Sequence, residues 1–103
     1  MKKLSANELE RWAGKVVDVR DLDEFAGERV AQAECIPLDR LLKEASRWDR
    51  SEPVLVMCKS GTRSEQAARQ LAEAGFREVA MLEGGIEACR KAGVYVIRQR
   101  AAI

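Results

Sequence analysis

The chain has 103 residues, 47% of them apolar and 34% charged, which is a length for one domain and a balance that argues against disorder. Eighteen basic and seventeen acidic residues leave a formal net charge of +1, too little bulk charge for a polyanion-binding surface, so we expect no nucleic-acid partner. The sequence contains no His, which excludes catalysis by Cys–His pairs or Ser–His–Asp triads and zinc sites that need imidazole.

The three cysteines, Cys35, Cys58 and Cys89, do not form a disulfide or metal-binding pattern. Their number is odd, and no two of them have the CxxC spacing of zinc ribbons or thioredoxin-like motifs. The start of the chain is basic but lacks the apolar core of a signal peptide, and no stretch is apolar for long enough to span a bilayer. We therefore expect one domain over residues 1–103 with reduced thiols, no metal or other cofactor, no membrane contact and a cytoplasmic location.

The first half of the chain predicts five short elements. They are a helix over residues 5–13 that ends at Gly14, a strand over 16–19, a helical turn within 20–34, an extended piece at 35–36 and a helix over 38–45. In the helical turn, Leu22 and Phe25 are the expected core anchors. The last helix is expected to have one apolar face, formed by Leu38, Leu41, Leu42 and Ala45.

The second half alternates strands and helices more regularly. It predicts a strand over 54–57, a helix from about Arg63 to a C-terminal Gly75, a strand over 79–82, a Gly84-Gly85 turn, a helix over 86–92 and an extended tail over 94–97. The strand over 54–57 is apolar throughout, which is typical of a central parallel strand covered on both faces. The order of the elements predicts an α/β fold with a central, mostly parallel sheet flanked by helices.

The loop after this central strand has the features of an anion-binding site. Cys58 stands at the carboxyl end of the strand, directly before a helix, where ligands bind in open parallel sheets. Gly61 lets the backbone amides curl round one point, and together with the helix N-terminus they favour a thiolate. Lys59 and Arg63 add positive charge, and hydroxyl groups come from Ser60, Thr62 and Ser64. A buried structural cysteine is the alternative, but the convergence of these features favours a nucleophile.

These residues carry a resemblance to the rhodanese family. The segment Cys58–Ser64, with Ala67-Ala68, Leu71, Gly75-Phe76, Val79, Leu82 and Gly84-Gly85, resembles the active-site half of a rhodanese domain. Upstream, the family's amino-terminal signature is similar to Val17–Arg20, Glu24-Phe25, Ala33 and Ile36–Leu38. The resemblance runs from about Leu4 to Val96 and implies the rhodanese-like three-layer fold.

The resemblance also implies a function, that of a rhodanese-type thiosulfate sulfurtransferase. Cys58 matches the catalytic cysteine, which takes a sulfane sulfur from a donor such as thiosulfate and passes it, as a persulfide, to cyanide or a thiol of a small molecule or protein. The substrate-binding loop of the family matches Lys59, Ser60, Gly61, Thr62 and Arg63. Arg63, with Lys59, is expected to hold an oxyanion such as thiosulfate or departing sulfite. This hypothesis requires that the sulfur be anionic at neutral pH and that it not face inward, away from solvent.

Two other functions use the same loop. A persulfide relay that serves a protein partner, with little thiosulfate turnover, needs the same cysteine cradle. A phosphatase or an arsenate-reacting enzyme also closes such a loop with arginine, but in cysteine-dependent phosphatases that arginine lies one position further from the cysteine. The shorter spacing between Cys58 and Arg63 favours a ring around a single sulfur atom.

Several residues are expected to be structural. Asp18 and Arg20 predict an ion pair that ties the first strand to its neighbours. Cys35 and Cys89 are expected to be small apolar fillers, and a resolving thiol for the Cys58 persulfide is the alternative. The dipeptide Glu28-Arg29 replaces the Gly-His that is usual in the family, which predicts a different path before Cys35, and Cys89 replaces a common tryptophan.

Overall fold

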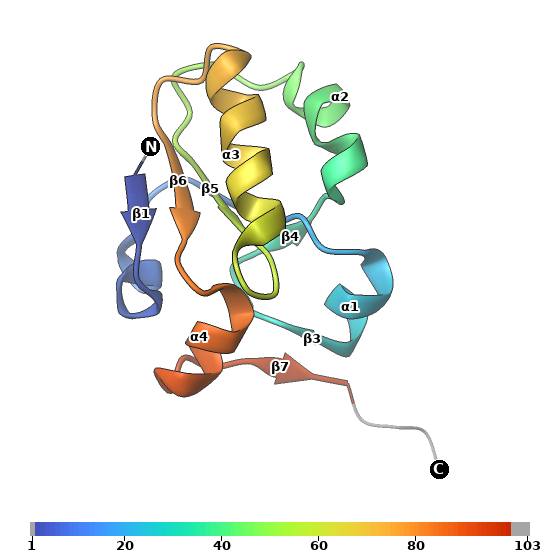
Figure 1. Ribbon diagram of the computed structural model, residues 1–103, viewed down its shortest axis with the longest axis vertical. Helices are drawn as coiled ribbons and strands as arrows, with labels where there is room; N and C mark the ends of the chain where they lie inside the picture. Colours follow the sequence, from blue (N-terminus) through green and yellow to red (C-terminus); the bar gives the residue numbers. More distant parts are fainter. Residues whose placement is uncertain (1, 100–103) are drawn as a thin grey trace.

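The structure, a computed structural model that describes residues 2–99, is built on a five-stranded sheet (Figure 1). In spatial order the strands are β1 (Lys2–Leu4), β6 (Val79–Leu82), β5 (Val54–Met57), β2 (Lys15–Asp18) and β4 (Glu34–Cys35). Every neighbouring pair in this sheet is parallel. The predicted α/β fold with a central parallel sheet is confirmed, with β5 in the middle.

Helices cover both faces of the sheet. One face is covered by α2 (Leu41–Ala45) and α3 (Thr62–Glu73), and the other by the 3₁₀ helix η1 (Ala6–Arg11) and α4 (Gly85–Lys91). In β5, Val54 and Val56 pack on the α3 side, whereas Leu55 and Met57 pack on the α4 side. All four side chains are fully buried, and each such Val or Leu stabilises the fold by about 1.5–3 kcal/mol. No helix within residues 2–99 is long and apolar enough to cross a bilayer.

The structure corrects several predicted elements in the first half. The predicted helix over 38–45 is a 3₁₀ turn, η2 (Leu38–Arg40), followed by α2, and Leu42 is 47% exposed because only Leu41 and Ala45 of α2 point to the core. In α1 (Leu22–Gly27), Leu22 is 60% exposed and Phe25 only half-buried, so the prediction that Leu22 is a core anchor is wrong.

The two lysines at the start of the chain do not predict a strand, but Lys2–Leu4 form β1, which pairs with β6 at the edge of the sheet and buries Leu4 in the core. The helix that follows begins with a capping box, in which the Glu8 carboxylate accepts a hydrogen bond of 3.0 Å from the Ser5 amide. It is a 3₁₀ helix and ends before Trp12, whose indole N–H donates to the Lys15 carbonyl at 2.9 Å.

A buried ion pair anchors α1 in place of its apolar residues. The Arg20 guanidinium lies 2.8 Å from an Asp18 carboxylate oxygen, and both side chains are almost fully buried, which confirms the predicted pair. Arg20 also donates to the main-chain carbonyls of Glu24, at 3.4 Å, and Glu28, at 2.6 Å. These bonds span α1 from its first turn to the residue after it, so Arg20 fixes the position of this helix against β2.

The C-terminal segment explains the unusual Glu28-Arg29 dipeptide. These two residues form β3, which pairs antiparallel with β7 (Ile97–Arg98) in a separate two-stranded sheet. The Glu28 carboxylate forms ion pairs with Arg90 of α4 and, at 3.5 Å, with Arg98. The predicted extended tail over 94–97 therefore contributes a strand, placed slightly later in the chain. Of the polar residues that follow this tail in the sequence, Arg98–Arg100, the last lies outside the described residues.

We expect Arg20→Leu to lower the free energy of unfolding by about 3–5 kcal/mol, because the buried Asp18 carboxylate loses its guanidinium partner. The matched control is Arg47→Leu, at an exposed position, which should change the free energy of unfolding by less than about 0.5 kcal/mol. Urea unfolding followed by circular dichroism measures both values. Equal values for the two variants would show that the buried pair contributes nothing specific.

Candidate active site

The predicted cysteine loop lies between the central strand and the longest helix. Cys58 follows the last residue of β5, and α3 begins at Thr62. Gly61, the N-cap residue of α3, has a φ of 118°, a backbone conformation that L side chains rarely adopt. This glycine turns the chain into the helix at once, so that only residues 58–61 separate strand from helix.

Three polar groups of the loop surround the sulfur of Cys58. The Gly61 amide donates a hydrogen bond of 3.1 Å to Sγ, and the Ser64 amide donates one of 3.4 Å. The Cys58 thiol donates to the Ser64 hydroxyl oxygen at 3.5 Å, and this hydroxyl donates to the Gly61 carbonyl at 3.0 Å. When the sulfur is ionised, the hydroxyl can turn and donate to it instead. The Ser64 amide belongs to the first turn of α3, whose N–H groups have no partner within the helix, so the sulfur caps the positive end of the helix dipole.

These contacts change the acidity of the thiol. Burial alone would raise the pKa of Cys58, but hydrogen bonds from the Ser64 side chain and from the amides of Ser64, Gly61 and Ser60 outweigh it, and the pKa is lowered. Burial raises the pKa of Cys35 and of Cys89, which lack such a set of donors. Cys58 is thus the thiol of the described chain that is most readily ionised.

The prediction that the Cys58 sulfur does not face away from solvent is wrong. The residue is only 1% exposed, because the loop closes over it, while Lys59, Ser60 and Thr62 of the same loop are exposed. Its sulfur points at the loop amides, on the α3 side of the sheet. A reactant must therefore enter the ring of loop amides to reach the sulfur.

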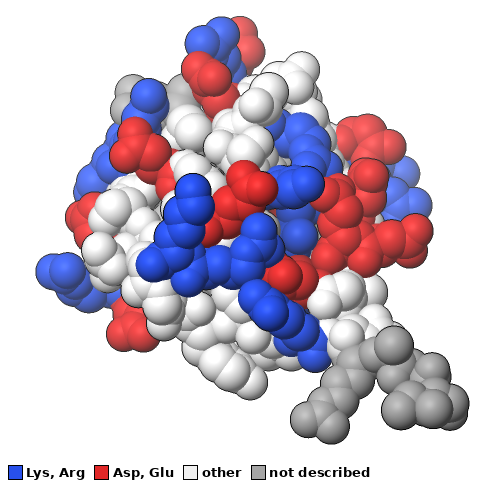
Figure 2. All heavy atoms as spheres, turned by 60° about the horizontal axis from the view of Figure 1, so that its bottom comes forward, with Lys and Arg blue, Asp and Glu red and all other residues white. Residues whose placement is uncertain are grey.

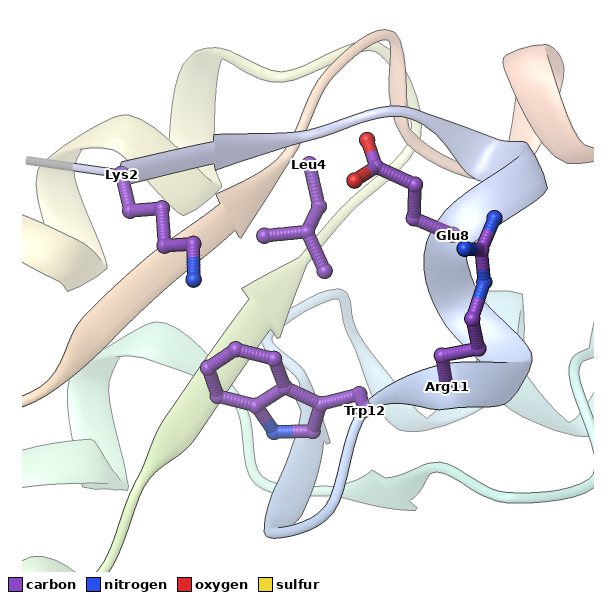
Figure 3. Close-up of a pocket in the computed structure, with 5 residues that line it drawn as sticks. All are labelled: Lys2, Leu4, Glu8, Arg11 and Trp12. Carbon is purple, nitrogen blue, oxygen red and sulfur yellow. The ribbon is translucent and has the colours of Figure 1, made fainter.

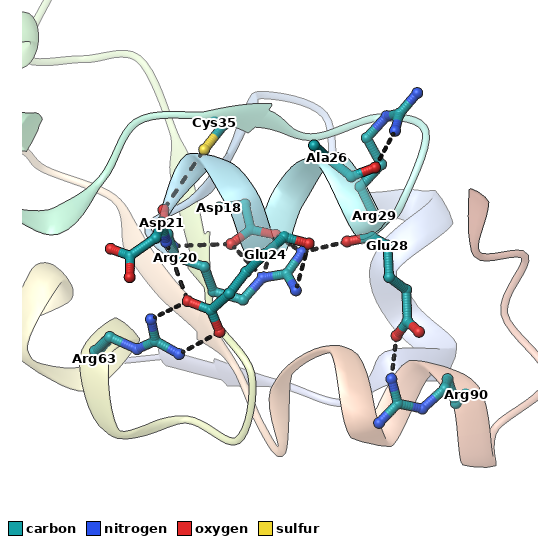
Figure 4. Close-up of polar contacts among 10 residues, drawn as sticks. All are labelled: Asp18, Arg20, Asp21, Glu24, Ala26, Glu28, Arg29, Cys35, Arg63 and Arg90. Atoms are coloured by element: carbon teal, nitrogen blue, oxygen red, sulfur yellow. Dashed lines mark hydrogen bonds and ion pairs between the residues drawn. The ribbon is translucent and has the colours of Figure 1, made fainter. Parts of the chain in front are cut away.

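Arg63, the expected oxyanion ligand, is already paired. Its guanidinium forms two hydrogen bonds with the Glu24 carboxylate of α1, of 2.6 and 3.1 Å (Figure 4). The hydrogen bonds from the Arg63 side chain are the main reason that the pKa of Glu24 is lowered to about 2. Lys59 makes no ion pair with any residue of the 2–99 range. The structure thus brings Arg63 to the loop mouth together with an acidic residue that the sequence analysis did not place in the site. The Asp21-x-x-Glu24 capping box could have located Glu24 at the start of a helix, but not opposite Arg63.

The Gly84-Gly85 turn, predicted only as a connection, supports the loop from the other side. The Ile86 amide donates to the Cys58 carbonyl at 2.9 Å, and the Glu87 amide donates to the Lys59 carbonyl at 3.2 Å. Gly85 has a φ of 59°, and a Cβ atom on it would lie 2.3 Å from the Cys58 carbonyl oxygen. The close approach of α4 to the loop therefore requires glycine at this position.

The other two cysteines are packed elsewhere. Cys89 is fully buried on the α4 side of the sheet, the face opposite to that of Cys58, as expected for an apolar filler. A resolving role for Cys89 would require it to cross the sheet. The Cys35 thiol, at the end of β4, donates a hydrogen bond of 3.5 Å to the Arg20 carbonyl and is only partly buried, so the prediction that it fills the core is wrong.

A separate hollow of about 180 Å³ lies beside the edge strand β1 and shares no residue with the loop (Figure 3). It is lined by Lys2, Leu4, Glu8, Arg11 and Trp12. The Glu8 carboxylate in it is bound by Ser5, and the Trp12 indole N–H is bound by a main-chain carbonyl. Across residues 2–99, no cluster of three or more Cys, Asp or Glu residues is placed to hold a metal ion.

The fold and the loop together define an α/β domain with a cysteine cradle at the carboxyl end of its central strand. The family model described as the rhodanese-like domain matches residues 2–92, and this chain belongs to that family. The expected family and its fold are thus confirmed.

Known proteins are similar to this chain along most of its length. Thiosulfate sulfurtransferase GlpE of Coxiella burnetii (strain RSA 331 / Henzerling II) is 39% identical over 72 residues, which make up 70% of this chain and 67% of that protein. The rhodanese-like domain of an Anabaena protein, solved by NMR, has a TM-score of 0.86 at 25% identity and covers 96% of this chain and 80% of its own. A rhodanese-related protein of Thermoplasma volcanium has a TM-score of 0.85 at 27% identity, over 96% of this chain and 100% of its own. The family and the similarity to GlpE support sulfurtransferase as the class of activity.

We expect Ser64→Ala to raise the pKa of Cys58, because the thiolate loses a hydroxyl group that can turn to donate a hydrogen bond to it. The rate of alkylation by iodoacetamide as a function of pH, followed for each cysteine by peptide mass spectrometry, measures this change. In the unsubstituted protein, the pH midpoint of alkylation for Cys58 should be lower than in the unfolded chain. The pH midpoints for Cys35 and Cys89 should be higher than in the unfolded chain. A Cys58 midpoint that is the same in the folded and unfolded states would contradict the cradle.

We expect Gly85→Ala to displace the loop and to lower the melting temperature, because its Cβ would overlap the Cys58 and Lys59 carbonyl oxygens. The strained φ alone costs about 1–2 kcal/mol for a residue with a Cβ atom. Gly27→Ala is the matched control, since nothing lies within 4 Å of its added Cβ. If the two variants had the same melting temperature and the same pH midpoint of Cys58 alkylation, the turn would not support the cradle.

Proposed function

We propose that the protein is a sulfurtransferase that moves a sulfane sulfur from a donor such as thiosulfate to cyanide or a thiol, through a persulfide on Cys58. The observation that carries this proposal is the sulfur surrounded by the Gly61 and Ser64 amides and the Ser64 hydroxyl, with a lowered pKa. The family and the similarity to GlpE support the same class of reaction.

The proposed chemistry takes place in two steps. The Cys58 thiolate attacks the outer sulfur of thiosulfate, an S–S bond forms to Cys58, the bond between the two sulfurs of thiosulfate breaks, and sulfite leaves with the electron pair. In the second step the acceptor attacks the terminal sulfur of the persulfide, and the Cys58 thiolate is the leaving group. Both steps place negative charge on sulfur inside the loop, where the amides of Gly61 and Ser64 are already oriented to accept it.

The other loop residues have supporting roles in this proposal. Ser60 and Gly61 contribute amides to the cradle, and Gly61 also turns the chain into α3. The exposed residues Lys59 and Thr62 stand at the mouth of the loop, next to Arg63, where an oxyanion would be held. The short spacing between cysteine and arginine disfavours a phosphatase, because the ring closes round one sulfur atom.

A persulfide relay for a protein partner is the second candidate, since it needs the same cradle. Because Cys58 is buried, any donor, free or carried by a protein, must enter the loop to reach it. The two candidates are distinguished by comparing thiosulfate-to-cyanide turnover with sulfur uptake from a cysteine desulfurase. Rapid uptake with negligible turnover indicates a relay.

We expect incubation with thiosulfate to add one sulfur atom to the protein, detected by intact mass, and Cys58→Ser to abolish the addition. Arg63→Ala should lower thiosulfate turnover by about tenfold or more, through lost charge-assisted hydrogen bonds, with little effect on folding. Arg69→Ala, on the exposed side of the same helix, is the matched control and should leave turnover unchanged. Persulfide formation that survives in Cys58→Ser would refute the assignment of the nucleophile.

A further inference from the structure

We propose that Glu24 selects sulfur donors by their charge: its carboxylate occupies the guanidinium of Arg63, so that the site favours thiosulfonates and thiol persulfides of low negative charge over dianionic thiosulfate. This inference rests on the proposed function. It concerns the donor class of the same site and assigns Glu24 as the residue that determines it.

The pairing of Glu24 with Arg63 uses the geometry that an oxyanion would use. Two carboxylate oxygens meet two guanidinium nitrogens at 2.6 and 3.1 Å, which is the bidentate arrangement by which arginine recognises carboxylates and phosphates. The two side chains are 34% and 32% exposed, so an incoming anion can reach the pair and compete with it. A donor that needs Arg63 must first displace an oxyanion that belongs to the protein.

The Glu24 carboxylate is held in position and remains charged. Its Oε1 accepts a hydrogen bond of 3.2 Å from the Asp21 amide, as the N3 residue of the α1 capping box. The main-chain carbonyl of Glu24 accepts from the buried Arg20. With a pKa of about 2, the carboxylate is ionised throughout the neutral range, so the competition with anionic donors is permanent.

Further carboxylates stand around the same arginine. A pocket of about 360 Å³ borders Arg63 and is lined by Val19, Asp21, Leu38, Asp39, Arg63 and Gln70. Two acidic residues and two aliphatic side chains thus line the space beside the loop, and Arg63 is its one basic residue. Such a pocket repels a dianion more than a monoanion, and its aliphatic walls suit an organic group attached to the transferred sulfur.

The charges of the surrounding surface are of both signs. The face that carries α1, α4 and the loop comes forward in Figure 2, where a band of basic side chains crosses the middle and acidic side chains gather beside it. Two of the arginines nearby, Arg90 and Arg98, are engaged by Glu28. A mixed surface with a net charge of +1 steers anions only weakly, so local contacts at Arg63 decide which donor binds.

The two donor classes undergo the same transfer and differ in charge. With thiosulfate, the Cys58 thiolate takes the outer sulfur and dianionic sulfite leaves. With methanethiosulfonate, a monoanion, the same S–S bond forms to Cys58 and methanesulfinate leaves as a monoanion. Because the nucleophile, the S–S bond that forms and the S–S bond that breaks are of the same kind in both reactions, a difference between the donors reports on charge and on the organic group.

The test is Glu24→Gln, which removes the charge but keeps an oxygen that can accept from the Asp21 amide, since Gln is also suited to the capping box. Steady-state kinetics with saturating cyanide should show the KM for thiosulfate falling about fivefold, the KM for methanethiosulfonate falling no more than about twofold, and kcat nearly unchanged for both donors. The matched control is Glu65→Gln, which makes the same change in net charge on the first turn of α3, where Glu65 pairs with Arg69. It should leave the ratio of the two KM values as it is in the unsubstituted protein.

Asp39→Asn is a second variant, which keeps the test decisive if Glu24→Gln does not fold. It removes another carboxylate of the pocket without touching Arg63, and the KM for thiosulfate should fall by about twofold. The inference would be overturned if the KM for thiosulfate were the same in the unsubstituted protein and the folded variants, or higher in Glu24→Gln. The proposal of a persulfide on Cys58 would not be affected by that result. If intact mass shows no added sulfur with either donor, the proposed function itself fails, and the inference fails with it.

Discussion

The structure depends on one electrostatic constraint, which is that a sulfur buried at the end of the central strand must be supplied with hydrogen-bond donors. Burial disfavours the thiolate of Cys58, and the amides of Gly61 and Ser64 with the Ser64 hydroxyl reverse that effect. Those donors converge only because Gly61 adopts a positive φ and because Gly85 allows α4 to approach the loop. The rest of the domain, a parallel sheet covered on both faces, holds this strand end and these two helix starts in a fixed relation.

The parts that could be predicted from sequence are those encoded by neighbouring residues. The apolar run of β5 identified a strand covered on both faces, and the position of Cys58 directly after it, before a glycine and a helix, located the cradle. Leu22, by contrast, has the spacing of a core residue on a helix but is exposed, because the buried Arg20 holds α1 in place. Local periodicity does not reveal that a polar group has taken over the role of an apolar one.

The parts that could not be predicted depend on contacts between distant segments. Glu24 and Arg63 are 39 residues apart, and Glu28 meets Arg90 across 62 residues, so no local pattern pairs them. The same holds for β3 and β7, two-residue strands that exist only through each other. Glu28-Arg29 looked in the sequence like a departure from the family, whereas in the fold Glu28 joins α4 and the C-terminal strand to the segment after α1.

Stability and donor choice are connected through one chain of contacts. Asp18 at the end of β2 pairs with Arg20, Arg20 donates to the carbonyl of Glu24, and the Glu24 carboxylate reaches Arg63 at the mouth of the cysteine loop (Figure 4). A buried ion pair costs more in desolvation than an apolar contact of the same size, and a helix anchored only by apolar residues would be simpler. The polar anchor offers what an apolar one does not: directional bonds that fix α1 in rotation as well as in position. Because a carboxylate can meet a guanidinium in a bidentate manner only within narrow limits, that fixed rotation is what places Glu24 opposite Arg63.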